Sequence, residues 1–410
     1  MNVKIPHIYS ITEVTAPPSK SFAQRAILAA TLAQQWSEIR NIGESDDVKH
    51  VLNTAKQLGA EIELIENGIR IKGSLSPIGT NLNCGESGLG TRLTIPIAAA
   101  IGGQFTISGE GSILSRPMDI FEEILPVMGV EISSNEGKLP IEIKGKLKGT
   151  NIEAEGSQSS QYFSGLLMAL PIADGESWIK IHNITSGPYL NMTLDVLSMF
   201  GIMIPVQENV FYVKGNQRYQ PAEFVVEGDW SGAAFWVVYG AISNPILIKD
   251  VNMFSSQADA AIVEILELAG GQFEWLDEGL QVQPQALNPF EVDATDCPDL
   301  FPALVVLAAS INGTSKIQGV NRLKHKESDR GVVLQQEFGK LGLLIELNED
   351  EMVIHGRGTL NSGVIDSHND HRIAMAAAIA SKLTYDGIQI TNAEAVSKSY
   401  PGFWDLIKID

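Results

Sequence analysis

The chain of 410 residues is predicted to be an α/β protein built from six copies of one supersecondary unit. The first observation is a set of glycines that recur at intervals of 70, 72, 69 and 72 residues. They are Gly59, Gly129, Gly201, Gly270 and Gly342. Apolar residues at helical spacing lead up to each glycine, which suits the left-handed position after a helix, and a strand pattern follows. An internal repeat of this length indicates one unit copied along the chain.

A second observation places another helix in each copy. Six times, a polar cluster is followed by an almost wholly apolar segment, so a helix is expected to begin at each cluster. The expected starts are Ser21, Ser87, Ser160, Ser231, Asp299 and Asp370. A helix that is apolar all round belongs in the interior, whereas the helices before the repeating glycines are amphipathic and should cover the outside.

The two ends of the chain complement each other. The last helical pattern, PGFWDLIKI, is not followed by strands, and the N-terminal segment NVKIPHIYSITEV can supply them. We therefore expect the repeat to be closed circularly, with three copies in each of two domains. One domain is expected to span residues 18–226, and the other residues 1–17 together with 227–410.

Composition argues against several classes of protein. A net charge of −20 argues against nucleic-acid binding, because a phosphate backbone requires a basic surface. No apolar run reaches the roughly 18 residues that a membrane helix needs, and no signal-peptide pattern opens the chain. Cys84 and Cys297 have no paired spacing, so we expect both to be buried and inert in a reducing cytoplasm. No metal-ligand spacing is present, and no metal is expected.

Basic side chains recur in the polar clusters. They are Lys20, Arg25, Arg116, Arg330, Arg372 and Lys398. Taken singly, each is best explained as a solvated surface residue. As a set they recur at helix starts, where unpaired N–H groups carry about half a positive charge. Six such N-termini gathered at one end would form a site for phosphates and carboxylates.

Other residues of the clusters have two interpretations each. Ser159–Gln161 and Ser186 offer hydroxyl and amide groups to a ligand, or they simply cap helices. Gly88 and Gly90 allow a ligand to approach the backbone, or they merely shape a turn.

Two carboxylates and a histidine are candidates for proton transfer. Glu327 lies between Lys326 and Arg330, and Asp299 lies in the sequence CPD. Among so many cations they could act as general acid or base; the alternatives are ion pairs and, for Asp299, a helix cap. For His371 the alternative is a structural hydrogen bond to a backbone carbonyl.

Together these clusters resemble the family of 5-enolpyruvylshikimate-3-phosphate synthases. The resemblance covers almost the whole chain, in the order PSKSFAQRAIL, ESGLGTR, SRP, SSQYFSGLLMALP, TSGPY, VEGDWSGAAF, CPDLFPAL, KHKESDR, NDHRIAM and SKSYPGFWDL. So many motifs in one order make the resemblance specific. It implies a two-domain inside-out α/β barrel with three pseudo-repeats in each domain.

The resemblance implies transfer of the enolpyruvyl group of phosphoenolpyruvate to the 5-hydroxyl of shikimate 3-phosphate, with release of phosphate, in the shikimate pathway to chorismate and aromatic amino acids. The hydroxyl adds to the enol carbon while the methylene is protonated, and the tetrahedral intermediate then loses phosphate and a proton. This chemistry needs anion-binding groups, an acid and a base, but no cofactor. We expect a cytoplasmic monomer that binds small anionic substrates and neither nucleic acid nor membrane.

The resemblance also implies a role for each matching residue. Shikimate 3-phosphate would be held by Lys20, Ser21, Arg25, Ser159, Ser160, Gln161, Ser186, Asp299, Arg322 and Lys326. Phosphoenolpyruvate would be held by Lys20, Gly88, Arg116, Gln161, Arg330, Arg372 and Lys398. Glu327 would protonate the methylene, and Asp299 would orient or deprotonate the 5-hydroxyl. Lys20 and His371 would assist in catalysis.

The chain departs from the family pattern at three places. Glu86 and Arg322 both stand where many members have Asn. The loop before Arg116 reads GSILS and lacks the charged residues that are common there.

The nearest alternative is the sister enzyme UDP-N-acetylglucosamine enolpyruvyl transferase, which shares the fold. Many of those carry a cysteine in the loop before the RP segment and a Lys-Asn pair near the N-terminus. This chain has no cysteine between Gly109 and Arg116, and it has SKS near the N-terminus. A non-catalytic phosphosugar-binding relative is a further alternative, but loss of Glu327, Asp299 or Lys20 would mark it, and all three are present.

Overall fold

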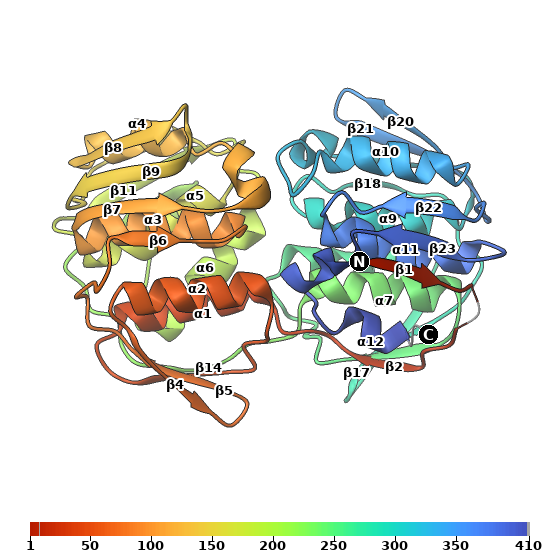
Figure 1. Ribbon diagram of the computed structural model, residues 1–410, viewed down its shortest axis with the longest axis horizontal. Helices are drawn as coiled ribbons and strands as arrows, with labels where there is room; N and C mark the ends of the chain where they lie inside the picture. The colour runs from red at the N-terminus through yellow and green to blue at the C-terminus, as the bar shows by residue number, and fades with distance from the viewer. Residues whose placement is uncertain (8, 408–410) are drawn as a thin grey trace. The chain divides into compact units, whose positions relative to one another are not determined.

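The computed structural model describes residues 1–7 and 9–407, which form two compact units. Unit 1 comprises Met1–Pro17 together with the chain from Glu227 onward, and unit 2 comprises Pro18–Val226. Each unit contains three β-sheets (Figure 1). Among the described residues, no helix is both long and apolar enough to cross a membrane.

One sheet of unit 2 shows the repeating unit in full. In chain order its elements are β6 (Asn81–Asn83), α3 (Gly88–Ile101), β7 (Gly103–Ser108), α4 (Ile120–Val127), β8 (Val130–Asn135) and β9 (Lys138–Gly145). The two strands that flank α3 pair in parallel, and the β8–β9 hairpin extends the sheet in antiparallel fashion. The sheet order is therefore β6-β7-β9-β8.

The other two sheets of unit 2 repeat this pattern. Their orders are β14-β3-β5-β4 and β10-β11-β13-β12. The strands are β3 (Ser37–Arg40), β4 (Glu61–Ile65), β5 (Gly68–Lys72), β10 (Ile152–Glu155), β11 (Ser177–His182), β12 (Val206–Gln207), β13 (Val210–Val213) and β14 (Glu223–Val225). The helices are α1 (Lys20–Leu32), α2 (Asp46–Gln57), α5 (Gln161–Ala169) and α6 (Gly187–Met199), with short 3₁₀ helices η1 (Gly111–Ser115) and η2 (Leu170–Ile172).

Unit 1 contains two further four-stranded sheets and one with three strands. Their orders are β16-β17-β15-β2, β18-β19-β21-β20 and β1-β23-β22. The strands are β1 (Asn2–Ile5), β2 (Glu13–Thr15), β15 (Ile246–Lys249), β16 (Gln272–Leu276), β17 (Gly279–Gln283), β18 (Glu291–Asp293), β19 (Asn312–Gln318), β20 (Leu344–Asn348), β21 (Glu351–Arg357), β22 (Gly363–Asp366) and β23 (Ile388–Thr391). The helices are α7 (Trp230–Ile242), α8 (Ile262–Leu268), α9 (Phe301–Ala309), α10 (Arg330–Lys340), α11 (His371–Ala380) and α12 (Phe403–Ile407). The 3₁₀ helices are η3 (Ala258–Ala261), η4 (Pro298–Leu300), η5 (Val320–Leu323), η6 (Ser381–Leu383) and η7 (Ala393–Lys398).

The apolar helices form the core of each unit, as the sequence predicts. Every residue of α9 and α11 is buried, and in α3 only Ile101 is not. These helices pack on one another within their unit, α3 on α5 and α9 on α7 and α11. The outer helices bury one face: α2, for example, buries Val48, Val51 and Ala55, which have helical spacing.

The five repeating glycines follow the outer helices. All five have positive φ, between 76° at Gly201 and 94° at Gly59. A side chain at such a φ is strained, and the next residues begin the hairpin of the same sheet. The prediction that each glycine ends a helix is therefore confirmed.

Three predicted helix starts need correction. Helix α1 begins at Lys20, one residue before Ser21. Helix α7 begins at Trp230 rather than Ser231, because the Asp229 carboxylate caps it by accepting from the Gly232 N–H at 2.8 Å. Asp299 lies in η4, and the α-helix proper starts only at Phe301.

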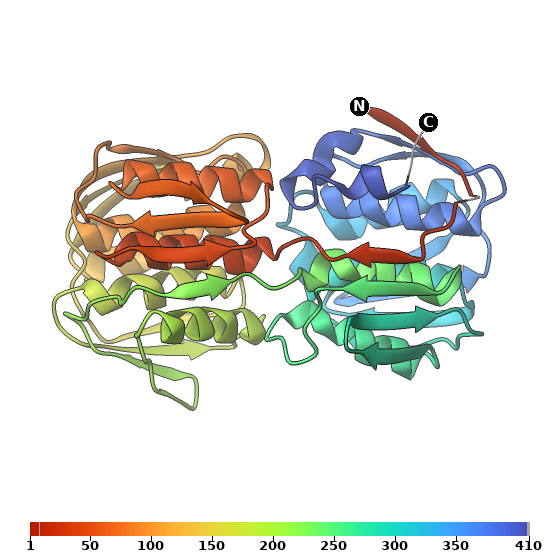
Figure 2. The ribbon, with the colours of Figure 1, turned by 90° about the horizontal axis from the view of Figure 1, so that it is seen from below.

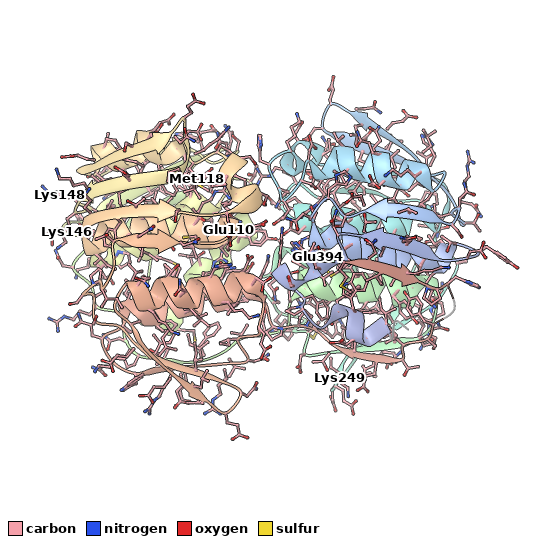
Figure 3. All side chains as sticks on the ribbon, viewed as in Figure 1. Glu110, Met118, Lys146, Lys148, Lys249 and Glu394 are labelled. Carbon is pink, nitrogen blue, oxygen red and sulfur yellow. The ribbon has the colours of Figure 1, made fainter. Side chains whose placement is uncertain are left out.

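Only one of the two N-terminal strands pairs with the last copy of the repeat, as the sequence predicts for both. β1 joins the last sheet, antiparallel to β23, but β2 pairs in parallel with β15 in a different sheet of unit 1. The Lys249–Glu13 ion pair (2.7 Å) bridges β15 and β2, and the Met1 ammonium pairs with Glu394 (2.6 Å); Lys249 and Glu394 are labelled in Figure 3.

The reason is an exchange of first strands between the units. β2 precedes α1 of unit 2 but stays in unit 1, and β14 precedes α7 of unit 1 but pairs with β3 in unit 2. Figure 2 shows β2 among the strands of unit 1 and β14 among those of unit 2. The chain thus passes between the units after Pro17 and after Val226.

Candidate active site

Unit 1 contains a partly buried network of alternating charges around Asp299. The Asp299 carboxylate accepts from Arg330 Nη1 at 2.8 Å and from Arg372 Nη2 at 3.0 Å, and Lys326 Nζ lies 3.2 Å away. These side chains come from η4, from the first residue of α10, from the start of α11 and from the segment after η5. The alternative interpretation of Asp299 as a helix cap is not supported, since the N-cap positions of η4 and α9 are Cys297 and Leu300.

Arg330 connects this network to two more carboxylates. Its Nε donates to Asp370 Oδ2 at 2.9 Å, and its Nη2 donates to Glu327 Oε2 at 2.7 Å. Arg330 is fully buried. Three cations therefore face three carboxylates, and we call these six residues the charged cluster of unit 1. They are Asp299, Lys326, Glu327, Arg330, Asp370 and Arg372.

The cluster fixes the ionisation of Asp299 and Arg330. Burial alone would raise the pKa of Asp299, but Arg372, Lys326 and Arg330 together hold it well below its ordinary value. Burial would likewise lower the pKa of Arg330, but Asp370, Glu327 and Asp299 raise it. Burial lowers the pKa of Lys326, and Asp299 opposes that shift. The cluster thus keeps Asp299 ionised and Arg330 charged at neutral pH.

Local capping explains why these residues converge. Asp370 caps α11 by accepting from the Arg372 N–H at 3.0 Å, and it also accepts from the Ser328 hydroxyl at 3.1 Å. Asp329 caps α10 by accepting from the Val332 N–H at 3.4 Å. Two helix N-termini, each favourable to negative charge, therefore start beside the carboxylates.

The remaining predicted residues of unit 1 lie nearby. His371 is the buried first residue of α11. Lys398 ends η7 and donates to the backbone carbonyl of Asn369 at 2.8 Å, next to Asp370. Arg322 lies in η5, and its charge acts on Lys326.

In unit 2, α1 carries three of the predicted residues. Lys20 Nζ lies 2.7 Å from Asp47 Oδ2. Arg25 is fully buried and donates to the Ser21 carbonyl (2.9 Å), the Thr193 hydroxyl (2.9 Å) and the Tyr189 carbonyl (3.1 Å). Burial lowers the pKa of Arg25 to about 10. Its guanidinium holds α1 against α6.

A second group in unit 2 forms around the start of α3. A Cβ placed on Gly88 would lie 2.5 Å from Arg116 Nη1 and 3.2 Å from Arg92 Nη1, so the backbone of Gly88 lies against both guanidinium groups. Arg92 Nη1 also donates to Gln161 Oε1 at 2.9 Å. The structure thus brings Gly88, Arg116 and Gln161 together. Glu86 accepts from the Ser112 hydroxyl at 3.3 Å in the loop before Arg116.

Ser160 and Ser186 do not act as side-chain helix caps, whereas Ser87 caps α3 by accepting from the Gly90 N–H at 3.1 Å. Ser160 precedes α5 and Ser186 precedes α6, and neither makes a side-chain cap hydrogen bond. Ser186 holds the left-handed conformation with φ 57°. Ser159 Oγ accepts from the Gln161 N–H at 3.3 Å. The interpretation of Ser160 and Ser186 as helix caps is therefore not supported.

The sequence predicts that the cations lie at the starts of the central helices, but only some of them do. Lys20 and Arg372 lie in the first turns of α1 and α11. Arg330 begins the outer helix α10, Arg116 follows η1, and Lys398 ends η7. The outer helices and loops therefore contribute to the clusters as well.

Four residues that hold these groups in place receive no site role from the sequence. They are Asp47, Arg92, Thr193 and Asp370. Arg92 carries a usable signal, because it is a charged residue inside the otherwise apolar helix α3. It also lies 4.8 Å from the ring of Tyr162 and donates to the Pro117 carbonyl at 3.2 Å, next to Arg116.

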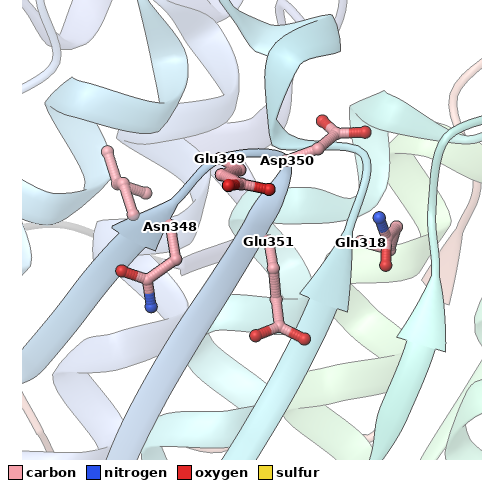
Figure 4. A pocket seen from close by; sticks show the side chains of 6 residues that line it. Gln318, Asn348, Glu349, Asp350 and Glu351 are labelled. Carbon is pink, nitrogen blue, oxygen red and sulfur yellow. The ribbon is translucent and has the colours of Figure 1, made fainter.

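A pocket at the β20–β21 turn is unsuited to anions (Figure 4). Its lining in the described chain is Gln318, Leu347, Asn348, Glu349, Asp350 and Glu351. None of these is basic. Asp350 connects the turn to the start of η5, since its carbonyl accepts from the Gly319 and Val320 N–H groups.

Comparison with known proteins decides between the families. The model of the EPSP synthase (3-phosphoshikimate 1-carboxyvinyltransferase) family matches residues 10–407. The chain belongs to this family. A 3-phosphoshikimate 1-carboxyvinyltransferase of Clostridium kluyveri is 38% identical over 398 residues, covering 96% of this chain and 93% of that protein. One of Clostridium novyi is 37% identical over 417 residues, covering 98% and 96%.

Solved structures agree with the family and its fold. The EPSP synthase of Acinetobacter baumannii superposes with a TM-score of 0.83 at 25% identity, over 99% of this chain and 97% of that one. An enolpyruvyl transferase of Streptomyces tendae has the same fold, with a TM-score of 0.81 at 14% identity and coverage of 99% and 96%. The predicted fold class, six repeats in an α/β protein of the enolpyruvyl transferase type, is confirmed.

Proposed function

We propose that this chain transfers the enolpyruvyl group of phosphoenolpyruvate to the 5-hydroxyl of shikimate 3-phosphate and releases phosphate. Membership of the family along nearly the whole chain supports this activity. The charged cluster of unit 1 carries the proposal, because it places two candidate proton-transfer carboxylates, Asp299 and Glu327, on one arginine.

The reaction requires three proton movements, and the proton that the 5-hydroxyl loses ends on the departing phosphate. The 5-hydroxyl loses a proton as its oxygen bonds to the enol carbon, and the methylene carbon gains one to become a methyl group. In the second step a proton leaves that methyl group while the C–O bond to phosphate breaks. Glu327 is proposed to give and take back the methylene proton, and Asp299 to orient or deprotonate the hydroxyl.

The cluster links substrate binding to the basicity of Asp299. In the resting protein its three cationic neighbours make Asp299 a weak base. An anionic substrate that draws Lys326 or Arg372 toward its own phosphate or carboxylate would weaken those contacts. The pKa of Asp299 would then rise, so the base would become effective only when substrate is bound.

The anion-binding residues are divided between the two units. We propose that shikimate 3-phosphate is bound by Lys20, Ser21, Arg25, Ser159, Ser160, Gln161, Ser186, Asp299, Arg322 and Lys326. We propose that phosphoenolpyruvate is bound by Lys20, Gly88, Arg116, Gln161, Arg330, Arg372 and Lys398, with Lys20 and His371 assisting in catalysis. The N–H groups of Arg25 and Arg330 described above already donate to protein oxygens. To bind a substrate, these arginines must therefore give up one of these hydrogen bonds or attract the anion by their charge alone.

The wider context is proposed on the same basis. Each unit would be one enolpyruvyl transferase domain with three repeats, and the protein would act as a cytoplasmic monomer in the shikimate pathway. Two sheets of unit 1 have the same order as the three sheets of unit 2, and the third has one strand fewer among the described residues, which supports the domain assignment.

A phosphate-release assay tests the activity. Purified protein is incubated with phosphoenolpyruvate alone, with added shikimate 3-phosphate, or with added UDP-N-acetylglucosamine. Phosphate should appear only with shikimate 3-phosphate. Release with the nucleotide sugar instead would assign the chain to the sister activity, and release with neither acceptor would favour the non-catalytic relative.

A further inference from the structure

Asp259 is a buried carboxyl group outside the charged cluster of unit 1. It belongs to η3, it is 1% exposed, and its Oδ2 contacts the hydroxyl of Ser231 in the first turn of α7. Its other oxygen, Oδ1, is buried and makes no hydrogen bond to any residue that the structure describes. A carboxylate in such surroundings is costly to ionise.

Several charged groups surround Asp259. η3 packs against α7, and α7 packs against both η4 and α11, which carry Asp299 and Arg372. Asp259 accordingly interacts with those two charges and with Asp229, which caps α7. The thiol of Cys297, just before η4, is a further titratable neighbour, and burial raises its pKa so that it stays neutral.

The charge balance leaves Asp259 without a cation of its own. The cluster already matches three cations with three carboxylates. Burial and the repulsion of Asp299 raise the pKa of Asp259 to about 7, although Arg372 opposes the shift. The carboxyl group therefore changes its charge close to neutral pH, whereas Asp299 does not.

We propose that Asp259 is a positioning residue that acts through Arg372 and controls phosphoenolpyruvate binding by its charge. In the neutral form, Asp259 leaves the charge of Arg372 to the anionic substrate. In the ionised form it competes with the substrate for Arg372 and repels an incoming phosphate or carboxylate. The inference rests on the proposed function, because that function assigns Arg372 to phosphoenolpyruvate.

The kinetic test compares Asp259→Asn with the wild type on both sides of pH 7. Asn has nearly the same shape and can keep the contact with Ser231, but it stays neutral. The ratio of kcat/KM for phosphoenolpyruvate, variant over wild type, should rise by about tenfold from low to high pH, as expected for one charge acting at close range. The ratio for shikimate 3-phosphate at saturating phosphoenolpyruvate should stay flat. Ionisation of the substrate itself cancels in these ratios.

A second readout does not depend on activity. Because the pKa of Asp259 is raised in the folded protein, the native state holds a proton that the unfolded chain has lost between about pH 4 and 7. The stability of the wild type should therefore fall as pH rises through this window. The Asp259→Asn protein should lack that fall, so its melting temperature should exceed that of the wild type increasingly from about pH 4 to 7 and by a constant amount above that range.

Matched controls separate the outcomes. Glu264→Gln removes an exposed carboxylate on the neighbouring helix α8 and should change neither ratio. If the activity assay fails but the melting difference appears, the proposed function is wrong while the titration of Asp259 stands. A kcat/KM ratio that is the same at every pH would mean a merely structural role and would overturn the proposal. A melting difference that is independent of pH would overturn it as well.

Discussion

Two arginines, Arg25 in unit 2 and Arg330 in unit 1, are both fully buried, but their hydrogen-bond acceptors are of opposite kinds. Arg25 donates only to hydroxyl and carbonyl oxygens, and burial lowers its pKa to about 10. Arg330 donates to three carboxylates, which raise its pKa against the effect of burial.

The difference indicates two tasks for the two regions. The charge of Arg25 is solvated by neutral dipoles and is therefore still felt by an anion. The charge of Arg330 is already compensated, and its main effect is to hold Glu327 and Asp299 in place and to keep Asp299 ionised. Unit 2 is thus suited to attract anionic substrates at Arg25, while the cluster in unit 1 is suited to move protons.

The largest expected effect comes from removing each buried charge. Arg330→Met leaves the buried Asp370 and the partly buried Asp299 and Glu327 without their common partner and should destabilise the protein by about 3–5 kcal/mol at neutral pH. Arg25→Met leaves only neutral acceptors unpaired and should cost about 1–3 kcal/mol. Urea denaturation of the two variants and the wild type measures both values.

The pH dependence of these losses sharpens the comparison. In the wild type the lowered pKa of Asp299 stabilises the folded state at pH values above the pKa that Asp299 has in the unfolded chain. This stabilisation is lost as the pH falls. Without Arg330 this stabilisation is smaller, because only Arg372 and Lys326 remain to lower the pKa, so the deficit of Arg330→Met should shrink toward acidic pH. The deficit of Arg25→Met should not change with pH. If Arg330→Met does not fold, Arg330→Lys keeps one charge and should show a smaller deficit of the same sign; a deficit independent of pH in both would contradict the assignment.

A smaller effect is expected when Arg330 keeps its charge and only Glu327, a candidate for proton transfer, is changed. Glu327→Gln keeps an oxygen for Arg330 but cannot donate or take up a proton. Turnover should fall by about 10²-fold or more, as for the loss of general acid–base catalysis, while shikimate 3-phosphate still binds. Asp329→Asn is the matched control, since Asp329 lies two residues away and only caps α10. Near-normal turnover of Glu327→Gln at saturating substrates would remove Glu327 from this role.

The repeat and its core could be predicted because both are local patterns. A glycine such as Gly342 ends a helix by its own φ of 82°, and an apolar helix such as α9 can only be buried. The partner of a short strand is not a local property. β2 has only three residues, and nothing in Glu13–Thr15 tells whether it joins the sheet of β15 or the one with β1.

The site was predictable to the extent that its residues lie in motifs. The sequence marks Asp299, Glu327 and Arg372, but not that Arg330 reaches Asp370, forty residues further on. That contact depends on how the repeats pack, because packing brings the start of α10 next to the start of α11. Asp259 lies in the unremarkable sequence ADAA and carries no signal, because its importance comes from burial and from neighbours on α7, η4 and α11.

The smallest effect is expected at Gly88, where the two interpretations of the sequence can be separated. Gly88 is the first residue of α3 and its φ is not in the left-handed region, so alanine fits the backbone. The added methyl would instead displace the guanidinium ends of Arg116 and Arg92. We expect Gly88→Ala to raise the KM for phosphoenolpyruvate by roughly fivefold, equivalent to about 1 kcal/mol, with little change in melting temperature.

Gly90→Ala, two residues along the same helix, provides the contrast. Its methyl would meet Ser87 Oγ and Val51 Cγ2, both at 3.0 Å, on the packed side of α3 rather than beside the guanidinium groups. This variant should lower the melting temperature, because a core side chain must shift, and it should change the KM for phosphoenolpyruvate less than Gly88→Ala does. If Gly88→Ala lost stability and kept its KM, Gly88 would be a packing residue and the anion-binding role of this helix start would fall. The opposite result would place Arg116 among the groups that hold phosphoenolpyruvate, since its guanidinium is the nearest one that the methyl displaces.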